Sequence, residues 1–69
     1  MLNKVWQCRN GYNKGLRIEE HIYPDGSKHY SMVNKFGTHN CTWKQAERII
    51  KFEKMEDMTE NYRAAGWVK

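Results

Sequence analysis

Two cysteines and three histidines are the side chains of this sequence whose types could do thiol or metal chemistry. His39 stands two residues before Cys41, so these two side chains could share a metal ion. Cys8 and either His21 or His29 would complete a tetrahedral site. The chain has no Cys-x-x-Cys pair, however, and its spacings match no zinc module. A disulfide between the two cysteines would close a loop of about 33 residues and stabilise the fold by roughly 3–4 kcal/mol. We expect two free thiols, no metal and no cofactor, with the metal site and the disulfide as alternatives.

A catalytic centre would need such groups arranged around a nucleophile. Cys41 and His39 have no recognisable third group that would orient the imidazole. Glu19 and Glu20 are adjacent in an expected strand, so their carboxylates point to opposite faces. A chain of 69 residues forms one domain, over residues 1–69, with little room for a large buried cleft. We therefore expect a non-catalytic binding module rather than an enzyme.

The charge balance indicates the kind of partner. Lys and Arg number 12, Asp and Glu number 8, and the formal net charge is +4. Lysine and arginine neutralise phosphates, and aromatic rings stack on bases. The sequence therefore favours nucleic-acid binding, with DNA as the leading partner, although a charge of this size is also common in domains that only need to stay dissolved. The candidate contact residues are Lys4, Trp6, Arg9, Lys14, Arg17, His21, Lys28, His29 and Lys35.

Alternation of apolar and polar residues predicts three antiparallel strands that carry most of these side chains, over residues 2–9, 16–23 and 28–34. The second and third strands are joined by residues 24–26, a Pro-Asp-Gly sequence that favours a tight turn. A short loop here pairs Ile18 with Met32, whereas a loop longer by one residue pairs Ile18 with Val33. We prefer the first register, because it keeps Tyr30 and Met32 on the apolar face.

The dipeptide Asn10-Gly11 predicts a two-residue type I′ turn between the first two strands. Such a turn pairs Val5 with Leu16, on the face that would lie under a helix. It also pairs Lys4 with Arg17 on the opposite face. That outer face would carry basic and aromatic side chains: Lys4, Trp6, Arg17, His21 and His29. A shift of one residue would instead place Trp6 in the core.

A change of period from two to 3.6 predicts a helix over residues 43–55. Thr42 and Gln45 have the types and spacing of a capping box at its start. A second short helix is predicted over residues 59–65, with Gly66 as its C-terminal cap. The predicted fold class is α+β: a three-stranded antiparallel sheet with the C-terminal helix packed on one face. The apolar stripe of that helix is Trp43, Ala46, Ile49 and Ile50.

Residues 35–38 (Lys-Phe-Gly-Thr), followed by a capped helix with Ala-Glu at residues 46 and 47, form a short motif. Together with the Asp-Gly-Ser-Lys turn at residues 25–28, the motif resembles DNA-binding domains of the AP2 type and the arm-binding domains of tyrosine recombinases. The resemblance covers about residues 4–55. It implies a three-stranded sheet whose exposed face enters the major groove, with Arg17 and Lys28 nearest to bases or phosphates. The stretch before the helix cap is longer here than in that family, and basic residues are fewer.

A protein-binding module is the alternative, of the kind found among inhibitors and regulators of phages and mobile elements. A chain of this size can present an interface of ~800 Å². The candidate contacts are Tyr62, Arg63 and Trp67, types that are enriched at binding hot spots. A sheet edge could also pair with a second copy to form a homodimer. No apolar run approaches the ~20 residues of a membrane span, and residues 1–7 lack the apolar core of a secretory signal. We therefore expect no membrane partner and a cytoplasmic location.

Overall fold

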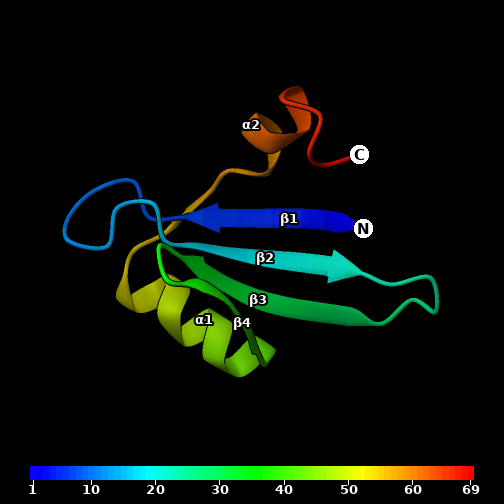
Figure 1. Cartoon of the computed structure of the whole chain (residues 1–69), viewed down its shortest axis with the longest axis horizontal. Helices are drawn as coiled ribbons and strands as arrows, with labels where there is room; N and C mark the ends of the chain where they lie inside the picture. The colour runs from blue at the N-terminus through cyan, green and yellow to red at the C-terminus, as the bar shows by residue number, and fades with distance from the viewer.

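The computed structural model describes residues 1–69 and has a five-stranded antiparallel sheet at its centre, in the order β4-β3-β2-β1-β5 (Figure 1). The fold is α+β with two helices, as predicted, but the sheet has five strands rather than three. The elements are β1 (Leu2–Gln7), β2 (Arg17–Ile22), β3 (Lys28–Asn34), β4 (Gly37–Cys41), α1 (Trp43–Phe52), β5 (Glu56–Asp57) and α2 (Thr59–Ala64).

The two additional strands form in segments that show no alternation of apolar and polar residues. β4 lies outside the three predicted strands, and a tight turn at residues 35 and 36 folds it back on β3, so that Asn34 pairs with Gly37. The side-chain Oδ1 of Asn34 accepts a hydrogen bond from the Phe36 N–H at 2.8 Å, which holds this turn. β5 is only two residues long and pairs with the end of β1. Both edge strands, β4 and β5, are therefore defined by backbone pairing with the neighbouring strand and not by a pattern of side chains.

The register between β1 and β2 differs from the prediction. Residues 8–16 form a wide loop instead of a two-residue turn, closed by the Cys8 N–H bonded to the Leu16 carbonyl at 2.8 Å. Trp6 consequently pairs with Ile18, where Val5 had been expected to lie opposite Leu16. Because successive side chains of a strand point to opposite faces, this change moves Trp6 from the outer face to the α1 face.

The register between β2 and β3 is confirmed. Ile18 pairs with Met32, and β3 has the predicted bounds. The turn that joins them is closed by the Tyr23 N–H bonded to the Ser27 carbonyl at 2.9 Å. Gly26 adopts φ 87°, which glycine reaches without steric cost.

Helix α1 begins as predicted and ends earlier. Thr42 and Gln45 make both hydrogen bonds of the capping box. The helix ends at Phe52 rather than at residue 55, because Lys54 adopts φ 52° and the Met55 N–H turns back to the Ile50 carbonyl at 2.9 Å. This is a Schellman motif with lysine at the position that glycine usually occupies.

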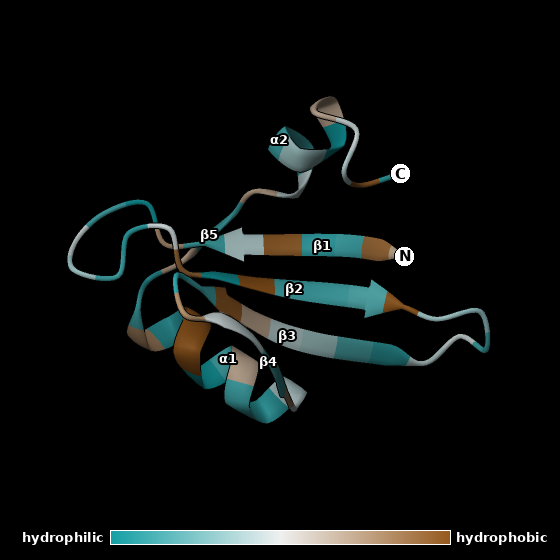
Figure 2. Ribbon diagram, in the orientation of Figure 1, coloured by the Kyte–Doolittle hydropathy of each residue, from teal (hydrophilic) through white to brown (hydrophobic).

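Different elements lie on the two faces of the sheet: α1 on one face, and α2 over β1 on the other. On the α1 face the buried side chains are Cys8, Ile18, Ala46 and Met55. On the other face, α2 lies along β1, where Tyr62 Oη donates to Gln7 Oε1 at 3.1 Å (Figure 1). Val5 and Val68 are buried, and the Val5 N–H donates to Thr59 Oγ1. Burying a side chain such as Ile18 or Val5 contributes about 1.5–3 kcal/mol. Figure 2 shows hydrophobic residues, coloured brown, both in α1 and in the strands.

The second helix, α2, begins at Thr59 as predicted and ends at Ala64, one residue earlier than predicted. Gly66 follows with φ 88°. Neither helix has the length and apolar content required to cross a lipid bilayer.

Candidate nucleic-acid interface

The open part of the sheet, over β2 and β3 on the face opposite α1, carries a chain of three charged or titratable side chains. Arg17 Nε donates to Glu19 Oε2 at 2.7 Å, and His21 Nε2 lies 3.0 Å from Glu19 Oε1. Burial alone would raise the pKa of Glu19, but the hydrogen bonds from Arg17 and His21 outweigh it, so this pKa is lowered. Glu19 therefore stays ionised and offsets the charge of Arg17. The middle of this face is close to neutral rather than strongly basic.

Trp6 is not part of that face, so its expected exposure beside Lys4 and Arg17 is wrong. Its ring packs against Trp43 at a centroid distance of 5.8 Å, and Trp43 packs against Tyr30 at 5.1 Å. This aromatic cluster lies on the α1 side of the sheet, where Trp6 and Tyr30 are half-buried and Trp43 is 41% exposed. Trp6 is thus a half-buried packing residue on the α1 face and not an exposed ring on the outer face.

Beside the β2–β3 turn, the titratable side chains bond to one another. His29 stacks on Tyr23 with ring centroids 4.0 Å apart. Ser27 Oγ lies 2.9 Å from His29 Nε2 and donates to Asp25 Oδ1 at 2.6 Å. In a catalytic triad the carboxylate orients the histidine and not the serine. Here the hydrogen bonds from Ser27 to Asp25 lower the pKa of Asp25 and hold the turn. A hollow beside this turn is lined by three of the candidate residues, His21, Lys28 and His29.

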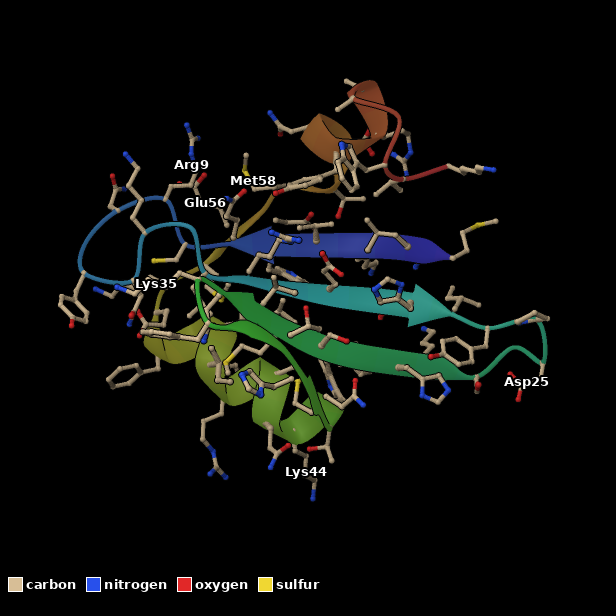
Figure 3. All side chains as sticks on the ribbon, viewed as in Figure 1. Arg9, Asp25, Lys35, Lys44, Glu56 and Met58 are labelled. Carbon is tan, nitrogen blue, oxygen red and sulfur yellow. The ribbon has the colours of Figure 1, made fainter.

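Arg9 and Lys4 are both exposed, and each interacts with a different residue of β5. Arg9 Nη1 is 3.4 Å from Glu56 Oε2, and Figure 3 shows this pair beside the end of β1. Lys4 lies on β1 and lowers the pKa of Asp57 less than the hydrogen bonds from Thr59 do. The nine candidate residues are therefore distributed over several surfaces.

Three of the candidates, Lys14, Arg17 and Lys35, line one open groove of about 680 Å³ at an end of the sheet. It lies between the loop at residues 8–16 and the β3–β4 turn, beside the C-terminal end of α1 (Figure 1). We call it the end groove. Its half-buried apolar side chains are Leu16, Met32, Val33 and Ile49.

Exposed aromatic rings border the end groove. Tyr12 is 99% exposed and Phe36 is 81% exposed, and both line it. Phe52, the last residue of α1, is 82% exposed at the same end of the molecule. The Lys35 ammonium lies 5.2 Å from the centre of the Phe36 ring, within cation–π range. Sequence reasoning missed these rings, although aromatic residues in turns with no apolar partner at strand spacing were an available signal.

The loop that carries Tyr12 and Lys14 is held to α1. Asn13 Nδ2 donates to Glu53 Oε1 at 2.7 Å, joining residues far apart in the sequence. Within the loop the Leu16 N–H donates to the Asn13 carbonyl at 2.9 Å. Gly15 provides the turn with φ 94°. The loop side of the groove's rim is therefore held by a hydrogen bond to Glu53, just after α1, and by a hydrogen bond within the loop.

The two cysteines are free thiols. Cys8 is buried on the α1 face of the sheet, whereas His21 projects from the opposite face, so the two cannot hold one metal ion. Burial raises the pKa of the Cys41 thiol. No group of three His, Cys, Asp or Glu side chains is arranged to hold a metal ion.

The three residues considered for protein binding differ in exposure. Tyr62 is half-buried and bonded to Gln7, and Arg63 is paired with Glu60. Trp67 is 67% exposed. The longer free edge of the sheet is β4, because β5 lies along β1 at the other edge.

The chain matches no protein-family model, no curated protein and no solved structure. The segment that carries the resemblance to AP2-type domains, residues 35–38, forms the β3–β4 turn and the start of β4. The functional argument therefore depends on the geometry of the surface itself.

Proposed function

We propose that this protein is a small, non-catalytic nucleic-acid-binding module, and that its contact surface is the end groove with its rim. One observation carries the proposal: apolar side chains at the end of the sheet are bordered by exposed rings and by basic side chains. Three basic residues, Lys14, Arg17 and Lys35, line this groove with one carboxylate, Glu53. Arg17 is paired with Glu19, so the unpaired positive charge comes from the two lysines. Neither lysine is engaged in an ion pair, so both ammonium groups can meet a phosphate.

The end groove replaces the centre of the sheet face as the proposed contact. Glu19 between Arg17 and His21 would repel a phosphate placed over β2. The AP2-type resemblance favours DNA, and Arg17 remains common to both locations, since it lies on the open face and also lines the groove.

The test is a fluorescence-anisotropy titration of labelled DNA at about 50 and 200 mM salt. The variant Lys14→Ala/Lys35→Ala should weaken binding about tenfold and reduce the salt dependence, because each lost phosphate contact lowers the slope by about 0.7–0.9. Lys28→Ala/Lys44→Ala is the matched control, since it removes the same charge elsewhere; Figure 3 shows Lys44 well away from Lys35. No binding at low salt, or equal loss in both variants, would contradict the proposal.

A protein-binding inhibitor or regulator is the second candidate, and the exposed ring of Trp67 favours it. Tryptophan is enriched at interface hot spots. Trp67→Ala should leave DNA affinity unchanged if the end groove is the contact surface. Loss of DNA binding in this variant would place the contact at the C-terminal segment instead.

The free edge at β4 is where a second copy would pair. Its five residues contain no proline, lysine, aspartate or glutamate, the features that usually protect an edge strand. Sedimentation of the wild-type chain against Asn40→Pro tests this homodimer, because proline removes a backbone donor from the edge.

A cytoplasmic location is part of the same proposal and is supported by the free thiols of Cys8 and Cys41.

A further inference from the structure

We infer that the end groove takes a single-stranded segment of nucleic acid, with unpaired bases stacked on Tyr12 and Phe36. This inference rests on the proposed function and names the form of nucleic acid that the same surface recognises.

The exposure of the two rings is the first reason. Tyr12 is 99% exposed and Phe36 is 81% exposed, so both rings are accessible to a ligand, with the Lys35 ammonium over one face of Phe36. Within a duplex, each base face is already covered by its neighbours. A protein ring can stack on a base only where the strand is unpaired or the duplex is opened. Exposed rings on the rim therefore match unpaired bases better than the outside of a duplex.

The shape and lining of the groove are the second reason. The major groove of DNA is read by an inserted helix or a two-stranded ribbon, which are convex elements. The end groove is a hollow of about 680 Å³ between a loop and a turn. Sites for small ligands measure about 300–1,000 Å³, so this hollow has the scale of one or a few nucleotides.

The distribution of polarity is the third reason. Leu16, Met32, Val33 and Ile49 give the groove an apolar lining, while Lys14 and Lys35 come from the loop and the turn beside it. A duplex presents its charged phosphates outward and its bases inward. A single strand can turn its bases toward the apolar lining and leave its phosphates beside the lysines.

The pairing of Lys35 with Phe36 connects the two kinds of contact. The ammonium lies 5.2 Å from the ring centre, so a base stacked on this ring has a positive charge next to it for its own phosphate. One turn would thus contact a base and its phosphate together.

The experiment compares an oligothymidylate of about 12 nucleotides, a length within the usual range for single-strand sites, with a duplex of equal length and with oligouridylate. Binding is followed by anisotropy with the wild type, Tyr12→Ala/Phe36→Ala, and the control Trp67→Ala. Tyr12→Phe provides a conservative variant, because it keeps the ring. The nearly complete exposure of Tyr12 means that its replacement should leave the fold intact, which circular dichroism checks.

We expect the wild type to bind the single strand at least about tenfold more tightly than the duplex, and the double variant to lose about tenfold or more. Tyr12→Phe and Trp67→Ala should bind like the wild type. Tighter binding to oligouridylate would assign the surface to RNA, and equal binding to both would assign it to either strand type. Equal or tighter binding to the duplex that still depends on Lys14 and Lys35 would overturn this inference and leave the proposed function standing. No binding to any of the three would overturn both.

Discussion

Tyr30 Oη donates a hydrogen bond of 2.8 Å to Glu20 Oε2, across the neighbouring strands β3 and β2. Glu20 is buried, and its other oxygen accepts from Asn3 Nδ2 at 2.6 Å. The carboxylate thus has a donor on each side, from β1 and from β3. A buried carboxylate costs free energy unless it is hydrogen-bonded, so this network ties three strands together beneath α1.

Tyr30→Phe should destabilise the fold by about 1–3 kcal/mol, because Glu20 then keeps only the hydrogen bond from Asn3. Urea unfolding followed by circular dichroism measures the change. Tyr23→Phe is the control, since no hydrogen bond of the Tyr23 hydroxyl is present and its ring packs on His29. Equal stability of the Tyr30→Phe variant and the wild type would show that the network contributes little.

The same hydrogen bond predicts a dependence on alkaline pH. Burial, then the hydrogen bond and charge of Glu20, raise the pKa of Tyr30 to about 12 from an ordinary value of 10.0. The folded chain therefore holds this proton more tightly than the unfolded chain. The resulting stability is fully present below pH 10 and is lost as the pH rises toward 12. Thermal melting across this range should show a steeper decline for the wild type than for Tyr30→Phe.

Glu19→Gln should strengthen nucleic-acid binding by about threefold or more, because it frees the charge of Arg17 next to the end groove. Anisotropy at about 50 mM salt detects the change. Glu60→Gln is the matched control: it frees Arg63, another paired arginine, on α2. A similar gain in both variants would mean that only net charge matters and not the position of Arg17.

Lys54→Gly should stabilise the fold by about 1 kcal/mol, because glycine adopts the left-handed conformation after α1 without the strain that lysine bears. Thermal unfolding measures this effect. Lys54→Ala removes the same charge and keeps the strain, so it should not be stabilising. A rise in the melting temperature of both variants would assign the effect to charge instead.

Asn13→Ala should weaken nucleic-acid binding severalfold while changing the free energy of unfolding by about 1 kcal/mol or less, since the bond to Glu53 is exposed. It positions the loop that carries Tyr12 and Lys14. A double-mutant cycle with Glu53→Ala measures the coupling. Additive effects of the two substitutions on affinity would exclude this positioning role.

The elements that could be predicted are those whose residue types and spacing specify their secondary structure. β2 and β3 alternate between apolar and polar residues, and the turn between them has distinctive types, so the pairing of Ile18 with Met32 could be predicted. The start of α1 was predictable from Thr42 and Gln45 for the same reason. β4 has no such alternation, because it is a polar edge strand held by backbone pairing with β3.

The candidate site was predicted only in part, because one register decided it. Asn10-Gly11 suggested a two-residue turn, whereas closure of the loop by Cys8 and Leu16 shifted β1 against β2. That shift carried Trp6 to the α1 face. Lys14, Arg17 and Lys35 were among the candidates, but their meeting at one end depends on the wide loop and on the β3–β4 turn. Neither feature follows from local residue types.

The rim of the end groove has a consequence for how this protein can change. Tyr12, Lys14, Lys35 and Phe36 are all exposed and stand outside the strands and helices. None of these four residues belongs to the buried set that stabilises the fold, which includes Ile18 and Ala46. Substitutions at the four positions can therefore accumulate without eroding stability, so selection can alter specificity rapidly on a constant framework. A library randomised at these positions would sample ligand preference while most of its members still fold.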